Sequence, residues 1–223
     1  QFDLYLDALE AMPYGKYLHV GGDEITAIGI DDRCKATGKT AFELQMIWLK
    51  NVCQFAVDHG RIPIFWDDMP LKYAGIWELA LSDKSEEEVV KVWNTDKLDE
   101  AIGLFPKECV YMRWKYEDAT TPAHRRLLEW YHDKVMGATA ASAGDSPFMP
   151  RRNTRSEYVK GFSQLVADNQ LEGILATAWD DGSPHLETVW RGFIAQGEFG
   201  WNPSARDIEA FKKAHAQREY GFR

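Results

Sequence analysis

The sequence contains no apolar run close to the ~20 residues that a helix needs to cross a bilayer, so no membrane-spanning segment and no membrane partner are predicted. It also lacks an excess of basic residues, because 26 Lys and Arg stand against 35 Asp and Glu, for a net charge of −9. A protein that binds a phosphate backbone needs a basic face. We therefore expect no nucleic acid partner, and the composition leaves the cellular compartment open.

Cysteine is scarce as well. The three residues, Cys34, Cys53 and Cys109, lie far apart in the sequence and form no CxxC pair. This spacing indicates neither a zinc site nor a disulfide framework, and it allows one disulfide while leaving at least one thiol free. Because the sequence also has no His-x-His or other dense ligand cluster, we expect no metal and no cofactor.

Aromatic side chains are abundant, at 13% of the residues, and nine of them are Trp. Many of these aromatic residues should lie in the core. Trp66, Trp114 and Trp179 are different, because each stands at the end of an apolar run and is followed by acidic residues. Core packing alone does not favour this placement, so these three Trp are candidates for a binding site.

Short, nearly continuous apolar runs alternate with helical stretches along the chain, which predicts strands buried on both faces of a parallel sheet. Such a sheet, with right-handed helical crossovers, gives an α/β fold. The predicted strands cover 16–22, 61–66, 109–114, 134–141 and 173–179. Helices are predicted over 40–60, 85–105, 156–173 and 183–200, with a further one over 202–223 that has Pro203 near its start.

Polar residues follow four of the five predicted strands, at the edge of the sheet where such folds place their sites. They are Asp23 and Glu24, then Asp67 and Asp68, then Tyr116, Glu117 and Asp118, and finally Asp180 and Asp181.

The acid pair in "YLHVGGDEI" suggests a specific chemistry. Neighbouring side chains of a strand point to opposite faces, so Asp23 and Glu24 share one pocket only if the strand stops or bulges before them. Gly21 and Gly22 allow this break. In a Trp-lined pocket, one carboxyl group can protonate a leaving oxygen while the other balances a cationic transition state, as in a glycosidase. Capping of a helix or binding of Mg²⁺ are alternative roles for the same pair.

These motifs resemble family 20 of the glycoside hydrolases, the β-N-acetylhexosaminidases. "HVGGDE" matches the His-x-Gly-Gly-Asp-Glu signature at the end of the family's barrel strand 4, "IPIFWDDM" resembles strand 5, and "GILATAWDDGS" resembles strand 8. The details, "WDDM", "RWKY" and "GATAAS", look closest to the hexosaminidase D branch. The resemblance covers roughly residues 14 to 200.

The resemblance implies a (β/α)8 TIM barrel and a retaining, substrate-assisted mechanism, in which the acetamido oxygen of the substrate attacks the anomeric carbon and forms an oxazolinium ion. It implies that Glu24 is the general acid and then the base, and that Asp23 holds the acetamido N–H. The implied substrate is a glycan with a terminal β-linked GlcNAc or GalNAc. The implied binding residues are His19, Trp66, Asp67, Asp68, Trp114, Tyr116, Trp179, Asp180 and Asp181. For His19, support of the loop is as good an interpretation as direct contact.

If "HVGGDE" ends strand 4, the chain holds only strands 4 to 8, since a full barrel needs about 250 residues. We then expect residues 1–200 to be a partial catalytic barrel and residues 201–223 to be a carboxyl-terminal helix that could begin a helical extension. The family's strand-1 Arg is absent from such a piece, and Asp68 stands where the family more often has Glu. The open sheet edge predicts an unstable fragment, self-association, or pairing with the missing barrel half.

Two other classes of function remain open at this point. A sugar-binding barrel without catalysis, or an inactive fragment of such an enzyme, is the first, although the intact acid pair argues against it. A metal-dependent hydrolase that uses the Asp-Asp pairs as oxygen ligands is the second, and the lack of a dense ligand cluster argues against that.

Overall fold

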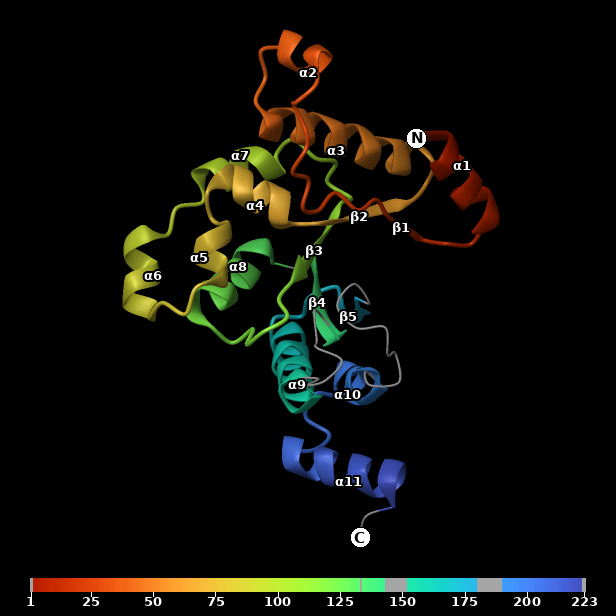
Figure 1. Ribbon diagram of the computed structural model, residues 1–223, viewed down its shortest axis with the longest axis vertical. Coiled ribbons are helices and arrows are strands. Elements are labelled where there is room, and N and C mark those ends of the chain that lie inside the picture. The colour runs from red at the N-terminus through yellow and green to blue at the C-terminus, as the bar shows by residue number, and fades with distance from the viewer. Residues whose placement is uncertain (1, 133, 143–151, 180–189, 222–223) are drawn as a thin grey trace. The chain divides into compact units, whose positions relative to one another are not determined.

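The computed structural model describes residues 2–132, 134–142, 152–179 and 190–221. Strands and helices alternate along this part of the chain (Figure 1). The elements are α1 (Phe2–Ala11), β1 (Tyr17–His19), α2 (Asp32–Ala36), α3 (Ala41–Asp58), β2 (Ile62–Trp66), α4 (Asp68–Ala74), α5 (Trp77–Leu81), α6 (Glu86–Val92), α7 (Asp96–Ile102), β3 (Val110–Trp114), α8 (Pro122–Tyr131), β4 (Val135–Ser142), α9 (Arg152–Asp168), β5 (Gly173–Ala178), α10 (Trp190–Trp201) and α11 (Ile208–Tyr220).

All five predicted strands are present, and their order in the sheet follows the chain, β1-β2-β3-β4-β5. The pairing is parallel, with Leu18 of β1 opposite Pro63 of β2 and Ile64 of β2 opposite Val110 of β3. In the last pair, Gly137 of β4 lies opposite Ile174 of β5. The α/β class is therefore confirmed, while the assignment of these strands to barrel positions 4 to 8 stays a prediction.

The chain forms two compact units, residues 1–80 with 90–112, and residues 81–89 with 113–223. The core of the first unit lies where α3 packs on β2 and α4. Leu49 and Phe65 are fully buried there. The helix α3 begins at a capping box, in which Thr40 and Glu43 each bond the other's main-chain N–H. This cap satisfies amides that a helix start leaves without partners, and it fixes where the apolar stripe of α3 begins.

In the second unit, α9 and α10 pack against β4 and β5, and α11 packs on α9. A Cβ on Gly192 of α10 would lie 2.5 Å from the Cα of Ala141, so only glycine allows this close approach of helix and strand. The buried residues Val159, Ala195, Phe199 and Phe211 form the cluster that joins the three helices. The carboxyl-terminal helix is thus part of the core of this unit.

The structure modifies four helix predictions. The stretch 85–105 forms two helices, α6 and α7, because Asn94 accepts a hydrogen bond from the main chain of Asp96 and offers it a turn. The last helix begins at Ile208, after Asp207 caps it through the Ala210 N–H, and not near Pro203. The helix α9 begins earlier than predicted, α10 begins at Trp190, and residues 183–189 of its predicted range lie outside the described residues.

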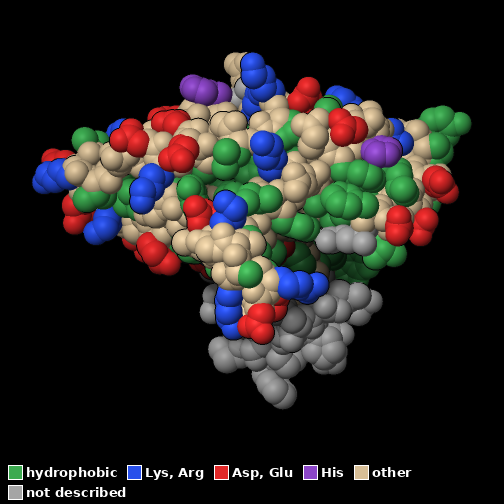
Figure 2. Space-filling model, turned by 90° about the horizontal axis from the view of Figure 1, so that it is seen from above, with side chains coloured by type: hydrophobic (Ala, Val, Ile, Leu, Met, Phe, Trp, Pro, Cys, Tyr) green, Lys and Arg blue, Asp and Glu red, His purple; other side chains and the backbone are tan. Residues whose placement is uncertain are grey.

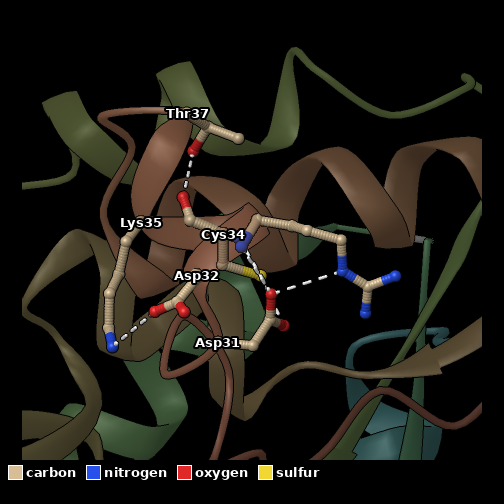
Figure 3. A network of polar contacts seen from close by, with 6 residues as sticks. Asp31, Asp32, Cys34, Lys35 and Thr37 are labelled. Carbon is tan, nitrogen blue, oxygen red and sulfur yellow. Dashed lines mark hydrogen bonds and ion pairs between the residues drawn. The ribbon is translucent and has the colours of Figure 1, made fainter.

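The sequence analysis predicted no helix at α1, α2, α4, α5 or α8. The helix α2 shows why such short elements escape a search for apolar periodicity (Figure 3). Asp31 accepts hydrogen bonds from the amides of Arg33 and Cys34, and Thr37 donates to the Cys34 carbonyl. Local polar contacts hold this helix, and none of its residues is buried.

All three cysteines are free, so the one disulfide that the count allowed is not formed. Cys53 and Cys109 are buried, and the hydrogen bond between the two side chains, together with burial, raises the pKa of the Cys53 thiol. Both thiols therefore act as small apolar groups of the first unit's core.

The surface intersperses acidic and basic side chains on the face seen in Figure 2. Among the described helices, none is long and apolar enough to span a bilayer.

Candidate active site

The strand β1 ends at His19, before the acid pair. The chain then passes through Gly21 and Gly22, which have φ angles of 75° and 98°, in the region that residues with a side chain avoid. A Cβ on Gly22 would also approach Leu49 Cδ1 to 3.1 Å. The strand therefore stops before Asp23 and Glu24, as the sequence analysis predicted, and the alternation of a regular strand no longer forces their side chains to opposite faces.

Three hydrogen bonds hold this loop to the strand and helix beside it. The Val20 amide donates to the Ile64 carbonyl at 2.8 Å, and the Trp66 amide donates to the Gly21 carbonyl at 3.1 Å. The side chain of Gln45, fully buried on α3, donates to the Gly22 carbonyl at 3.1 Å. The loop is thus fixed on both sides, although it belongs to no regular element.

The two acids have different surroundings. Asp23 is half-buried, and burial raises the pKa of its carboxyl group. The nearby Asp68 carboxylate adds to this rise, while the Lys72 ammonium opposes it. Glu24 is exposed and has a φ of 46°, one of three positive values found at non-glycine residues in the described part of the chain. Its main-chain N–H donates to Asp68 Oδ2 at 3.0 Å.

The second acid pair follows β2, and both of its side chains are fully buried. The Asp67 amide donates to the Met112 carbonyl at 3.1 Å, which ties the end of β2 to β3. Asp68 is the first residue of α4 and forms an ion pair with Lys72, one turn later, at 2.8 Å. The hydrogen bond from the Glu24 N–H therefore places Asp68 in direct contact with the loop of the first acid pair.

His19 packs against Trp66, with ring centroids 4.9 Å apart and the planes tilted by 57°. Its Nδ1 accepts a hydrogen bond from the Gly21 amide at 3.1 Å, so the ring carries no proton on that nitrogen in the neutral form. The side chain keeps an exposed edge, but burial of the rest of the ring lowers its pKa to about 4. This contact agrees with the interpretation of His19 as a support for the loop.

We expect the free energy of unfolding to fall as the pH drops from about 6.5, the usual His pKa, toward about 4. The folded-state pKa of His19 is lowered, so in this window the unfolded chain binds more protons, and stability is lost as the pH falls. The variant His19→Asn keeps an acceptor near the Gly21 N–H and does not titrate there. Urea unfolding across this pH range should give it a shallower slope than the wild type; equal slopes would contradict the assignment.

The second compact unit contributes an aromatic group. The Trp179 indole N–H donates to the Tyr116 hydroxyl at 2.7 Å, and the rings of Trp114 and Tyr116 lie 5.0 Å apart. The carboxyl ends of β3 and β5 thus bring three predicted residues together. Trp179 exposes 41% of its surface, which leaves part of the ring open to a ligand.

The predicted residues therefore form two groups, one in each unit. His19, Asp23, Glu24, Trp66, Asp67 and Asp68 belong to the first, and Trp114, Tyr116 and Trp179 to the second. Asp180 and Asp181 lie outside the described residues. Glu117 is in the second unit, and Asp118 there accepts a hydrogen bond from the Thr120 amide, which makes a local turn.

The sequence analysis missed Gln45 and Lys72. A polar residue within the apolar stripe of α3 was the available signal for Gln45, and the spacing of four residues from Asp68 was the signal for Lys72. No cluster of three or more His, Cys, Asp or Glu side chains that could hold a metal ion occurs among the described residues.

Comparison with known proteins gives two findings. The model of the glycosyl hydrolase family 20 catalytic domain matches residues 3–203. The crystal structure of a β-N-acetylhexosaminidase from Bacteroides fragilis NCTC 9343 is similar, with a TM-score of 0.57 and 17% identity, over 97% of this chain and 42% of that one. This likeness supports the same fold, a partial TIM barrel with five parallel strands, and the chain spans less than half of that protein's length. No curated protein matches the chain.

Proposed function

Because the chain belongs to glycosyl hydrolase family 20 over residues 3–203, we propose that the protein that carries it removes terminal β-linked N-acetylhexosamine from glycans or glycoconjugates. The observation that carries this proposal is the acid pair Asp23–Glu24, presented beyond the end of β1 by Gly21 and Gly22. Within the family, we propose the hexosaminidase D branch, on the motifs "WDDM", "RWKY" and "GATAAS".

In the proposed mechanism, Glu24 gives its proton to the glycosidic oxygen as the bond to the anomeric carbon breaks. The acetamido oxygen of the substrate attacks that carbon from the other face and forms an oxazolinium ion, so the configuration is retained after water opens the ring. In the second step, Glu24 takes a proton from this water. The exposure of Glu24 is consistent with a group that must reach both a leaving oxygen and a water molecule.

Asp23 has the complementary role. Its carboxylate accepts a hydrogen bond from the acetamido N–H and balances the positive charge that develops on the oxazolinium ring. Burial raises the pKa of Asp23, which means that the folded protein pays a free-energy cost for its negative charge. A cation formed beside this carboxylate relieves part of that cost, and the relief grows as positive charge develops on the way from the bound substrate, through the transition state, to the oxazolinium ion.

The aromatic residues would bind the sugar. Trp66 lies near the acid pair in the first unit, and Trp114, Tyr116 and Trp179 contact one another in the second. Trp rings suit the apolar face of a pyranose and the acetamide methyl group. The Tyr116 hydroxyl, which accepts from Trp179, is proposed to donate its own proton to the acetamide oxygen. Asp180 is proposed to bind a sugar hydroxyl. Asp67, whose side chain is fully buried, is proposed to support the end of β2 beside the sugar.

A choice of substrates tests the reaction. In the complete protein that carries these 223 residues, we expect hydrolysis of an aryl β-N-acetylglucosaminide and almost none of the matching β-glucoside, because the glucoside lacks the attacking acetamide. Equal turnover of the two would contradict substrate assistance. Binding of N-acetylglucosamine with no turnover of either would favour the non-catalytic, sugar-binding barrel.

A further inference from the structure

The candidate acid Glu24 owes its position to its backbone. Its φ of 46° lies in the left-handed region, where a residue with a side chain is unfavourable unless its surroundings hold it there. Glycine would adopt this conformation without strain, but Glu24 cannot be glycine if its carboxyl group is needed. Something else must therefore hold the Glu24 backbone in place.

Within the described residues, Asp68 holds the Glu24 main chain, because its Oδ2 accepts the Glu24 N–H at 3.0 Å. The same oxygen accepts from Lys72 Nζ at 2.8 Å. Asp68 exposes none of its surface, whereas the Lys72 side chain exposes 27%. A buried carboxylate needs a partner charge, and Lys72 supplies it from the next turn of α4.

Lys72 is held in turn. Its ammonium lies 5.0 Å from the centroid of the Trp77 ring, over the face of the indole. Trp77, Lys72, Asp68 and Glu24 thus form a continuous row of contacts. These contacts couple the position of α4 to the backbone of Glu24. A misplacement of about 1 Å at a reacting group can lower the rate by about 100-fold.

We propose that Asp68, held by Lys72, is a positioning residue that fixes the backbone of Glu24 so that its carboxyl group meets the leaving oxygen. This proposal rests on the proposed function and gives Asp68 a different role from that of a ligand for sugar hydroxyls. Full burial of Asp68 speaks for the supporting role. Its Oδ1 has no hydrogen-bond partner among the described residues, so Glu24 and Lys72 both bind the carboxylate through Oδ2.

The test uses two aryl β-N-acetylglucosaminides with the complete protein that carries this chain. One has a poor leaving group, 4-methoxyphenol, which needs protonation as it departs. The other has a good leaving group, 2,4-dinitrophenol, which does not. Misplacement of the general acid slows the first step, measured as kcat/KM, for the first substrate and spares it for the second, whereas general damage to the protein slows it for both.

We expect Asp68→Ala to lower kcat/KM for the methoxyphenyl substrate by about 10- to 100-fold, through kcat and with KM nearly unchanged, and to lower kcat/KM far less for the dinitrophenyl substrate. Asp68→Asn should retain more activity, because its amide oxygen can still accept the Glu24 N–H. Lys72→Met keeps the apolar stem beside Trp77 and removes the charge, so it should show the same pattern to a lesser degree.

Lys212→Met is the matched control. It removes a lysine of similar exposure, 19%, from ion pairs with Glu157 and Glu209, and it should leave kcat for both substrates unchanged. Thermal melts of all variants check that each one folds.

The outcomes separate the two proposals. A rise in KM for both substrates with little change in kcat would show that Asp68 binds the sugar. Equal losses of kcat/KM on both substrates, with KM unchanged, would show a merely structural role. Either result overturns the positioning proposal while leaving the proposed function intact. A wild-type protein that hydrolyses neither substrate overturns both.

Discussion

Replacing Glu24 by Gln is expected to lower kcat on the methoxyphenyl N-acetylglucosaminide by about 10²- to 10⁴-fold, the usual contribution of a general acid. The amide has nearly the size of the carboxyl group and cannot donate a proton to the glycosidic oxygen. Because the Glu24 N–H bond to Asp68 is a main-chain contact, the substitution leaves it in place, and the melting temperature should stay close to that of the wild type. Steady-state kinetics and a thermal melt measure the two effects.

The leaving group again provides the internal control. With the dinitrophenyl substrate, Glu24→Gln should lose far less in the first step, since that phenolate departs without protonation. Exogenous azide, a nucleophile that needs no general base, should then restore part of the turnover of this variant. If Glu24→Gln hydrolyses both substrates at the wild-type rate, Glu24 is not the acid, and the family's signature would have lost its role in this protein.

Replacing Asp23 by Asn is expected to have two opposite effects. Activity on N-acetylglucosaminides should fall by about 10²- to 10³-fold, because the variant no longer places a negative charge against the oxazolinium ion. Stability near neutral pH should rise. Burial raises the pKa of Asp23 in the folded state. Above the usual Asp pKa of about 3.9, ionising this carboxyl group therefore costs more free energy in the folded protein than in the unfolded chain. Stability is lost as the pH rises from that value through the raised pKa. Asn removes that cost.

Melting temperatures of wild type and Asp23→Asn between pH 3 and pH 8 test whether the substitution raises stability as predicted. The two should agree at the acid end and separate as the pH rises, with the variant the more stable. Asp31→Asn is the matched control, because the pKa of Asp31 is shifted in the opposite direction. Hydrogen bonds from Cys34 lower this pKa, and the ionised carboxylate caps α2. It should gain no stability at neutral pH. A variant Asp23→Asn that is less stable than wild type at pH 7 would contradict the assigned cause.

Much of the fold could be predicted because parallel strands that are buried on both faces leave continuous apolar runs in the sequence. All five runs became strands, and the long helix α3 followed its apolar period and its capping box. The short helices α2, α4 and α5 have too few residues for a period to show. Their existence depends on local caps and on packing, which a pattern of residue types does not record.

The candidate site divides in the same way. The break of β1 could be predicted because glycine adopts backbone angles that other residues avoid. Gly21 and Gly22 both have positive φ angles of this kind. The contacts that hold the loop could not be predicted from the sequence. The Gln45 side chain reaches a carbonyl 23 positions away, Asp68 reaches an amide 44 positions away, and Trp179 reaches a hydroxyl 63 positions away.

By itself, the sequence determined the type of fold and the chemical character of the site: five strands in chain order, an acid pair after a glycine break, and Trp beside acids at strand ends. These features depend on residue type and near spacing, which fix local geometry and side-chain chemistry. The tertiary structure decided how Asp68 is used. Two neighbouring aspartates look alike in the sequence, and the packing of α4 under the loop turns Asp68 to the Glu24 amide and to Lys72. Contacts between distant segments arise only when the chain is folded.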